Sequence, residues 1–332
     1  MTILVTGGGG FLGRNIVRAL LDRGETVRIF SRQRYPEIEA WGAEAVQGDL
    51  VRPEDVERAV KGATAVFHTA ARVGYWGPYA EYHATNVEGT RALLRAAEAA
   101  GVSSFVHTSS PSVVLGPTTN IEHGDESLPY VRSRIHAYGT TKGEGEALVL
   151  AANRPGFGTA ALRPHFIYGP GDSHIVPRLL ARARAGKLVQ VGDGTNQIDV
   201  TYIENAVSAH LGAFDALVAN SKAVGGRAYF IGDREPVRLW SFVNDVLTGF
   251  GVAPVARRVS FSLAKAIGFA LEKSYAMLGI RDEPPLTRMA AVMLGRSHYF
   301  SHARAARDFG YDPQVSTHEG LSRLFRAGDG AA

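Results

Sequence analysis

Residues 2–13 read Thr2-Ile3-Leu4-Val5-Thr6-Gly7-Gly8-Gly9-Gly10-Phe11-Leu12-Gly13. A short apolar run, typical of a buried strand, leads into glycines and then into a helical pattern. Gly7, Gly10 and Gly13 permit a tight turn, a close approach of the backbone to a pyrophosphate and close packing of helix on strand. The stretch therefore predicts a dinucleotide-binding βαβ unit whose helix N-terminus faces the phosphates. A glycine turn without a ligand is the alternative.

The same alternation of short apolar runs and amphipathic helical patterns continues through the first half of the chain. We expect strands at Thr2–Thr6, Thr26–Phe30, Ala43–Gln47, Ala65–His68, Ser104–His107 and Thr159–Leu162. We expect helices at Leu12–Arg23, Pro53–Val60, Asn86–Ala100 and Ala137–Asn153. Such alternation is typical of a parallel sheet covered by crossover helices. The sequence therefore predicts an α/β fold, a Rossmann-type doubly wound parallel sheet with a smaller C-terminal substrate lobe.

The length of the chain and a change of pattern indicate the second lobe. The 332 residues suit about two lobes of ordinary domain size. After Pro164, proline and glycine become frequent and the alternation stops, although Glu204–Leu217 and Ala228–Ile231 read as a helix and a strand of the first lobe. We expect a dinucleotide-binding Rossmann domain in residues 1–164 plus about 198–232, and a substrate-binding lobe in about 165–197 and 233–332.

Composition excludes several classes of function. Hydrophobic residues make up 45% and charged residues 20% of the chain, as in a soluble globular protein. There is no cysteine, so neither a disulfide framework nor a thiolate metal site or nucleophile is available, and we expect no metal site. The net charge of +4 comes from scattered basic residues, so nucleic acid is not an expected partner. No secretory signal or membrane-spanning run is recognisable, which predicts a cytoplasmic protein without a membrane span.

The end of the second predicted strand bears on the choice of cofactor. A carboxylate there would bind the ribose 2′-hydroxyl of NAD, whereas an arginine suits the 2′-phosphate of NADP. Here Ser31 and Arg32 follow the strand and no carboxylate is present, which favours NADPH and leaves NAD(H) as the alternative. Arg32 could equally belong to an ordinary loop or stack on adenine. Asp49 and Leu50, after the third strand, are expected near the adenine.

Tyr138 and Lys142 carry the predicted chemistry. They are four residues apart on a predicted helix and so share one face. A phenol can exchange a proton with a carbonyl or alcohol oxygen while hydride moves, and a nearby cation is expected to lower the pKa of that phenol. Lys142 can also hold the nicotinamide ribose. Ser110 follows the strand before this helix and can stabilise charge on the substrate oxygen, although Ser109 competes for the role.

These motifs resemble the extended short-chain dehydrogenase/reductase family over essentially the whole chain. The resemblance is carried by the glycine loop, Asp49-Leu50, His68-Thr69-Ala70-Ala71, Asn86-Val87-Glu88-Gly89-Thr90, Tyr138 to Lys142 and Leu162-Arg163-Pro164. The stretches 163–172, 176–179 and 199–205 resemble the 3-beta-hydroxysteroid dehydrogenase branch of that family. The sequence departs from the common pattern at Val114, where tyrosine is frequent, which leaves the substrate fit open.

The resemblance implies the roles of further residues. It implies a catalytic triad of Ser110, Tyr138 and Lys142. The cofactor-binding residues that it implies are Gly7, Gly10, Phe11, Leu12, Gly13, Ser31, Arg32, Asp49, Leu50, Thr69, Ala70, Ala71, Asn86, Tyr138, Lys142, Pro164, His165 and Ile167. Candidate substrate residues are Arg72, Trp76, Tyr79, Ser109 and His165. It further implies a homodimer that pairs the helices at 86–100 and 137–153.

Within the branch, the segments at 75–79, 283–288 and 309–315 are similar to bacterial 2-alkyl-3-oxoalkanoate reductases of olefin biosynthesis, and the chain is also similar to sterol-4-alpha-carboxylate 3-dehydrogenases. Both act in lipid metabolism on hydrophobic small molecules. We therefore expect NADPH-dependent reduction of a 2-alkyl-3-oxoalkanoate to the 3-hydroxy acid. The alternatives are a 3-beta-hydroxysteroid or sterol-4-carboxylate dehydrogenase and, less well supported, a nucleotide-sugar epimerase. The apolar helical pattern of Ser262–Ile280 is interpreted as a lid, a face for peripheral association with a membrane or partner, or a core helix.

Overall fold

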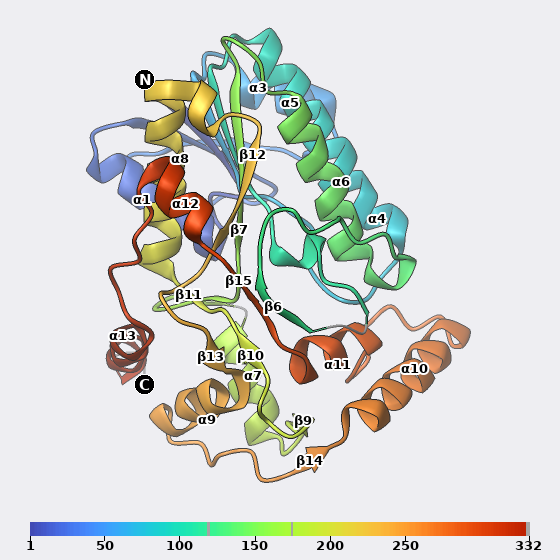
Figure 1. Cartoon of the computed structure of the whole chain (residues 1–332). Coiled ribbons are helices and arrows are strands. Elements are labelled where there is room, and N and C mark those ends of the chain that lie inside the picture. The colour runs from blue at the N-terminus through green and yellow to red at the C-terminus, as the bar shows by residue number, and fades with distance from the viewer. Residues whose placement is uncertain (118–119, 174, 330–332) are drawn as a thin grey trace.

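The computed structural model describes residues 1–117, 120–173 and 175–329. Its main sheet has seven parallel strands in the order β12-β7-β5-β4-β1-β2-β3 (Figure 1). Their bounds are β1 Thr2–Thr6, β2 Thr26–Ser31, β3 Glu44–Gln47, β4 Ala65–His68, β5 Ser104–Thr108, β7 Gly158–Pro164 and β12 Arg227–Ile231. The strand order reverses direction between β1 and β4, and ligands of open α/β sheets bind at such a point, outside the carboxyl ends of the strands. The predicted α/β Rossmann-type fold is confirmed.

Helices cover both faces of this sheet. One layer contains α1 Phe11–Asp22, α8 Ile203–Val224 and α12 Ala303–Phe309, and the other contains α3 Pro53–Val60, α5 Thr90–Ala99 and α6 Ala137–Ala151 (Figure 1). Side chains of β1 alternate between the two layers, as the pleat of a strand requires. Ile3 and Val5 join the core under α1, whereas Leu4 joins the core under α3 and α5. Each face of the sheet thus has its own apolar core.

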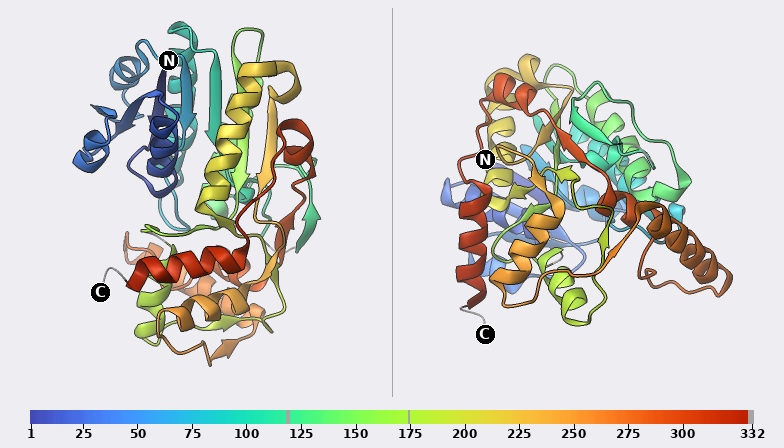
Figure 2. Two further views of the ribbon diagram at one scale, coloured as in Figure 1. Left: turned by 90° about the vertical axis from the view of Figure 1, so that its left-hand side faces the viewer. Right: turned by 60° about the horizontal axis from the view of Figure 1, so that its bottom comes forward.

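The second group of elements lies below the carboxyl ends of the strands (Figures 1 and 2). A small sheet runs β13-β10-β15-β6, and the pairs β11-β8 and β14-β9 stand apart from it. The strand bounds are β6 Ile121–Gly124, β8 Ile167–Tyr168, β9 Gln190–Val191, β10 Gln197–Ile198, β11 Thr201–Tyr202, β13 Val237–Arg238, β14 Arg258–Val259 and β15 His298–Phe300. The helices are α7 Ile175–Arg184, α9 Leu239–Gly249, α10 Phe261–Met277, α11 Arg288–Gly295 and α13 Thr317–Asp329. The division into two lobes stays a prediction. The strand β6 and the helix α12 cross the expected boundary, because β6 pairs with β15 and α12 packs on α8.

Short elements complete the chain, and one of them changes the first turn of a predicted helix. They are α2 Pro36–Ala40, α4 Tyr79–His83, the π-helix η1 Ala84–Gly89 and the 3₁₀ turns η2 Pro111–Val113 and η3 Arg134–His136. The helix expected at Asn86–Ala100 begins as this π-helical turn and becomes α-helical only at Thr90. Close packing accompanies the turn, because a Cβ atom on Gly145 would lie 2.3 Å from the carbonyl oxygen of Asn86. π-turns of this kind are often found at functional sites.

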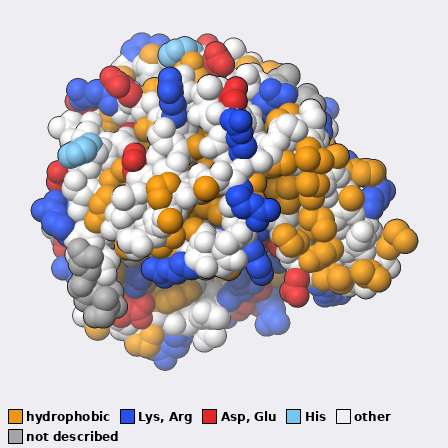
Figure 3. Space-filling model, turned by 90° about the horizontal axis from the view of Figure 1, so that it is seen from below, with side chains coloured by type: hydrophobic (Ala, Val, Ile, Leu, Met, Phe, Trp, Pro, Cys, Tyr) orange, Lys and Arg blue, Asp and Glu red, His pale blue; other side chains and the backbone are white. Residues whose placement is uncertain are grey.

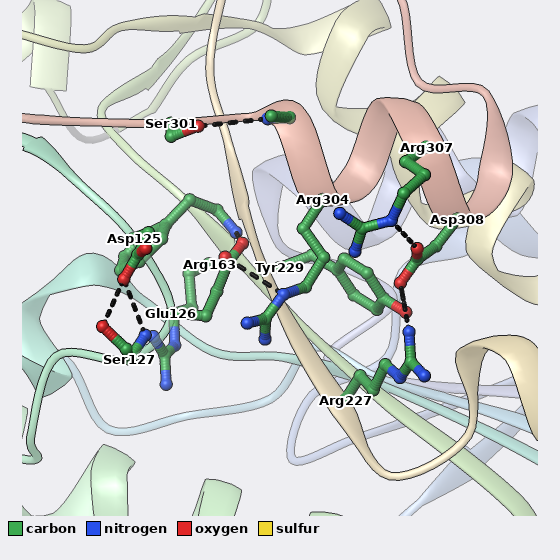
Figure 4. A network of polar contacts seen from close by, with 12 residues as sticks. Asp125, Glu126, Ser127, Arg163, Arg227, Tyr229, Ser301, Arg304, Arg307 and Asp308 are labelled. Carbon is green, nitrogen blue, oxygen red and sulfur yellow. Dashed lines mark hydrogen bonds and ion pairs between the residues drawn. The ribbon is translucent and has the colours of Figure 1, made fainter.

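The outer edge of the main sheet is closed by side chains. The amide of Phe230 in β12 donates to Oε1 of Glu126 at 3.0 Å, and Arg304 of α12 lies 3.3 Å from the other carboxylate oxygen (Figure 4). Asp308 binds both Arg227 and the hydroxyl of Tyr229, at 2.8 and 3.1 Å. The network therefore satisfies an edge amide that could otherwise pair with another strand.

Candidate active site

Tyr138 and Ser110 meet at the carboxyl end of the main sheet. Ser110 follows β5, and its Oγ accepts a hydrogen bond from the amide of Ser112 at 3.2 Å, which holds the side chain in place. The Ser110 side chain also lies close enough to the Tyr138 phenol to influence its pKa. Desolvation raises the pKa of Tyr138, and the contact with Ser110 opposes this shift. The expectation that Lys142 lowers this pKa was wrong, since burial dominates and the ammonium group is directed elsewhere.

Lys142 lies on the same face of α6, buried below Tyr138. Only 2% of its surface is exposed. Its Nζ donates to the carbonyl oxygen of Thr108 at 2.6 Å and lies 3.2 Å from Nε2 of His107. Desolvation lowers the pKa of Lys142 to about 7, although the charge of Glu146 acts in the opposite direction. The ammonium group is therefore fixed by acceptors at the end of β5 and can lose its proton near neutral pH.

A buried ion pair anchors α6 to the sheet. Arg163 of β7 donates to Glu146 of α6 through Nε at 3.0 Å and through Nη2 at 2.6 Å. The Tyr130 hydroxyl donates to the same carboxylate at 2.7 Å. Glu146 is four residues after Lys142 and lies on the same stripe of the helix. The ion pair thereby fixes the position of α6 on β7. The sequence analysis did not assign a role to Glu146 or Arg163.

Two histidines lie side by side beneath the site. His68 Nε2 lies 3.0 Å from Oγ1 of Thr90, whose own proton is donated to the carbonyl oxygen of Asn86. Nε2 therefore carries the proton, and Nδ1 accepts from the hydroxyl of Thr6 at 2.7 Å. The ring of His107 lies 5.0 Å from that of His68, and its Nδ1 has no partner among the described residues. Burial lowers the pKa of both rings, so both are neutral at physiological pH.

The glycine loop has the backbone that a dinucleotide site needs. Gly7 has a φ of 69°, and a Cβ atom on Gly13 would lie 2.2 Å from the carbonyl oxygen of Gly7. The N-cap residue of α1 is Gly10, which has no side chain to accept hydrogen bonds. The backbone amides of Phe11 and Leu12 at the start of the helix are therefore not blocked by a capping side chain. These amides and the positive end of the helix fit a pyrophosphate.

The neighbouring residues extend the cofactor cradle. The Thr69 hydroxyl donates to the carbonyl oxygen of Thr6 at 2.7 Å, and Ala70 lies against Gly7. Ala71 follows in the same loop at the end of β4. Tyr35 was missed from the sequence, yet its ring packs directly on Gly9, which has no side chain to prevent this. Tyr35 is far from Gly9 in the sequence, and no motif indicates that the two residues meet.

The adenosine side carries an exposed cation. Ser31 donates to the carbonyl oxygen of Gln33 at 2.7 Å. Arg32 is exposed and forms no ion pair within the described parts of the chain, whereas Arg34 is paired with Glu39. Asp49 accepts from the amide of Val51 at 3.2 Å, and Leu50 is buried beside it. The arrangement fits a negatively charged group on the adenosine ribose, and no carboxylate follows β2 directly.

Comparison with known proteins places the chain in a family. The model of the 3-beta hydroxysteroid dehydrogenase/isomerase family matches residues 4–263. The chain belongs to this family. It is 47% identical over 325 residues to the 2-alkyl-3-oxoalkanoate reductase of Stenotrophomonas maltophilia (strain K279a), and the alignment covers 98% of each chain. It is 36% identical to the sterol-4-alpha-carboxylate 3-dehydrogenase, decarboxylating, of Mus musculus, over 97% of this chain and 90% of the other.

Solved structures agree with this assignment. MoeE5 in complex with UDP-glucuronic acid and NAD superposes with a TM-score of 0.76 and 26% identity over the full length of both chains. The resemblance seen in the sequence is thus confirmed, and the protein is an NAD(P)-dependent oxidoreductase of the extended short-chain type.

The other predicted cofactor residues contact neighbouring parts of this chain. Asn86 bridges the 69–78 loop and the catalytic helix, because Oδ1 accepts from the amide of Arg72 at 2.8 Å and Nδ2 donates to Thr141 at 3.1 Å. Pro164 ends β7, and Ile167 lies in β8. His165 is buried, and its Nε2 lies 2.6 Å from Nδ1 of His298.

The predicted substrate residues do not all lie on one side of the site. The hydroxyl of Tyr79 donates to Glu144 at 3.0 Å, on a face of α6 different from that of Tyr138, so the structure does not bring Tyr79 to the catalytic phenol. Tyr75 packs instead against a buried apolar cluster that includes Val113 and Val114, which follow Ser110 closely. Tyr75 shares its loop with the predicted residues, but only the fold shows which aromatic of that loop turns inward.

The remaining candidates have separate surroundings. Arg72 pairs with Glu81 at 2.5 Å and lies over the ring of Tyr82. Trp76 packs edge-on against Tyr275 of α10 and donates from its indole to the carbonyl oxygen of Ile280 at 3.4 Å. Ser109 is buried, and its hydroxyl has no partner among the described residues. The described residues contain no cluster of acidic, histidine or cysteine side chains suited to a metal ion.

Proposed function

We propose that the protein is an NADPH-dependent reductase that converts a 2-alkyl-3-oxoalkanoate into the 2-alkyl-3-hydroxyalkanoate. The observation that carries this proposal is that Tyr138 and Lys142 share one face of α6, and that Lys142 is held at the end of β5, the strand that leads into Ser110. The 47% identity to a 2-alkyl-3-oxoalkanoate reductase over nearly the whole chain supports the choice of substrate.

Tyr138 acts as the acid in this proposal. Desolvation raises the pKa of its phenol, so the side chain keeps its proton until a carbonyl oxygen becomes basic. Ser110 donates a hydrogen bond to the same oxygen and stabilises the negative charge that develops there. Tyr138 then transfers its proton to that oxygen. Lys142 is held by Thr108 and His107, and in its protonated form it would hold the nicotinamide ribose beside the phenol.

The cofactor supplies the hydride that reduces the substrate carbonyl. The amides that follow Gly10 and the wall formed by Thr69, Ala70 and Ala71 would hold its pyrophosphate, and Asp49 and Leu50 would lie at the adenine. We favour NADPH because Arg32 is exposed and unpaired within the described chain. NAD(H) is the alternative, since the similar MoeE5 structure contains NAD. Asn86, Pro164, His165 and Ile167 complete the proposed cofactor site.

Tyr75 and Trp76 form the proposed apolar wall for the alkyl chains of the substrate, next to Ser109. Arg72 is the proposed source of positive charge toward the carboxylate, because its guanidinium stays near this wall over Tyr82. His165 is a weaker candidate, since its Nε2 is engaged by His298 and burial lowers its pKa well below the usual value. Tyr79 is assigned to no substrate contact.

Steady-state turnover tests the proposal. The purified protein is mixed with a 2-alkyl-3-oxo acid and either NADPH or NADH, and oxidation of the cofactor is followed by absorbance. Fast oxidation of NADPH that depends on the keto acid is the expected result. Turnover of a 3-beta-hydroxysteroid or a sterol-4-carboxylate with NAD⁺, and none of the keto acid, would overturn the substrate and favour the second candidate, which the 36% identity to the mouse enzyme supports. Epimerisation of a UDP-sugar would favour the third.

Three further assignments accompany the proposal. We propose, as the sequence resemblance implies, a cytoplasmic protein that acts in the lipid metabolism of olefin biosynthesis. We also propose a homodimer through the outer faces of α5 and α6. A groove on that side is lined by Tyr79, Tyr130, Glu144 and Ala147, which offers a complementary surface for the same helices of a second copy. Light scattering in solution measures the oligomeric state directly.

A further inference from the structure

The helix α10 is attached to the molecule along one narrow face. Only Ala264 and Gly268 of its residues are buried, and they lie four apart on that face. A Cβ atom on Gly268 would lie 2.7 Å from the backbone of Thr287, so the helix rests directly on the start of α11. Glu272, one turn further on, binds Arg288 at 2.6 Å. This contact orients α10 firmly, and the helix projects from the rest of the molecule (Figures 1 and 2).

Outside that narrow face, α10 and the turn after it present exposed apolar side chains, which we call the apolar face. The exposed fractions are 53% for Leu263, 41% for Ile267, 86% for Met277 and 72% for Leu278. Figure 3 shows the hydrophobic side chains gathered over this projecting part of the surface. A helix on the surface of a globular protein ordinarily turns polar residues outward. Here the pattern is inverted, and contiguous exposed apolar patches mark sites of interaction.

Positive charge lies among and beside these apolar side chains. Lys265, Lys273 and Arg281 form no ion pair within the described chain, and Lys273 lies over the ring of Phe269. The carboxylates of the region are already engaged, because Glu272 binds Arg288 and Glu283 binds Arg178. Only Asp282 adds an uncompensated negative charge. Lysine stems can lie along apolar surface while their ammonium groups reach outward.

We propose that α10 and the turn after it, residues 261–281, dock on the surface of an anionic lipid bilayer. The apolar face would enter the boundary between headgroups and acyl chains, and the cations around it would contact lipid phosphates. A two-fold contact with a second copy fits less well, since it would bring two cationic rims together. No described helix is long and apolar enough to cross a membrane, so the contact would be peripheral.

The position of α10 links such docking to the active site. Trp76 packs on Tyr275 of α10 and hydrogen bonds to Ile280, while the adjacent Tyr75 packs against the cluster that includes Val113 and Val114, just after Ser110. A lipid-borne molecule would therefore meet the catalytic loop directly beside the docked helix. The proposal itself depends on the surface of α10 and not on the proposed reaction.

Co-sedimentation of the full chain with vesicles tests this inference. The probes are vesicles of phosphatidylcholine mixed with phosphatidylglycerol and vesicles of phosphatidylcholine alone. We expect binding to the anionic vesicles that weakens as salt increases. The double variant Leu263→Glu/Ile267→Glu should lose at least about tenfold in affinity, since charge replaces the inserted apolar groups. Lys265→Glu/Lys273→Glu should lose affinity for the anionic vesicles specifically.

Val218→Glu is the matched control, because Val218 is 61% exposed on α8, away from α10. It should bind vesicles as the unmodified chain does, and circular dichroism should show all variants folded. Absence of binding to anionic vesicles, or equal binding by Leu263→Glu/Ile267→Glu, would overturn the inference. So would light scattering in which that double variant, but not Val218→Glu, dissociates a dimer, because the face would then belong to a second copy. Vesicle binding and oligomeric state are measured without turnover, so the result does not depend on whether the proposed reaction is correct.

Discussion

The ammonium nitrogen of Lys142 lies 3.2 Å from Nε2 of His107, and both side chains are buried. Neutral His107 can accept a hydrogen bond from the protonated amine, as the carbonyl oxygen of Thr108 does. Its Nδ1 then carries the proton, and no described residue pairs with it. The contact joins β5 to the catalytic helix from below, and it makes the protonation of Lys142 depend on a buried imidazole.

Replacing His107 should therefore alter the pH profile. The pKa of Lys142 is lowered to about 7 by desolvation, so its charge, and with it reduction, should be lost as pH rises through that value. His107→Leu removes an acceptor from the charged amine, which should move this alkaline limb to lower pH and reduce kcat at neutral pH by about tenfold or more. His107→Gln retains an acceptor and should recover much of the loss. Identical pH profiles for His107→Leu and the unmodified enzyme would contradict this role.

The phenol of Tyr138 should be indispensable for turnover. Tyr138→Phe removes the proton donor while keeping the ring, so kcat should fall by about 10²–10⁴-fold. Binding of NADPH, measured by fluorescence titration, should change little. The control is Tyr79→Phe, whose hydroxyl contacts Glu144 away from the site and whose loss should leave kcat nearly unchanged. Comparable kcat values for the two variants would remove Tyr138 from the mechanism.

The elements near the glycine loop could be placed closely from the sequence. The strand at Thr2–Thr6 and the helix at Pro53–Val60 have the predicted bounds, because apolar runs and helical periodicity are local signals. The placement of Tyr138 and Lys142 on one helix, and of Ser110 just after one strand, could also be predicted, and their catalytic roles stay a prediction.

Contacts between distant segments could not be predicted in this way. Glu146 and Arg163, or Lys142 and His107, meet only because α6 crosses the ends of β5 and β7. Nothing in the residues around 75–82 shows that Tyr75 packs on the apolar cluster next to Ser110 while Tyr79 contacts Glu144. Packing decides which side of a short helix such as α4 faces the core. Five residues are too few for a hydrophobic pattern to predict that side.

Arg32 should control the choice between the two nicotinamide cofactors. If its exposed guanidinium meets the 2′-phosphate, Arg32→Ala should raise KM for NADPH by about tenfold or more and leave KM for NADH nearly unchanged. Arg34→Ala is the control, because Arg34 is already paired with Glu39. Equal changes of KM for both cofactors in Arg32→Ala would instead assign Arg32 to stacking on the adenine that both share.

The ion pair between Glu146 and Arg163 should be needed for folding more than for chemistry. Its side chains are 0% and 3% exposed, so Glu146→Gln would leave the Arg163 guanidinium buried without a counter-charge. Removing one partner of such a pair costs about 3–5 kcal/mol of unfolding free energy, which should appear as a clear loss of Tm in thermal denaturation. The exposed pair of Arg154 and Glu98 provides the comparison, and Glu98→Gln should leave Tm nearly unchanged because solvent screens that contact. A Glu146→Gln protein with undiminished Tm would show that Tyr130 and Arg163 find other partners, and α6 would then need no anchor at this position.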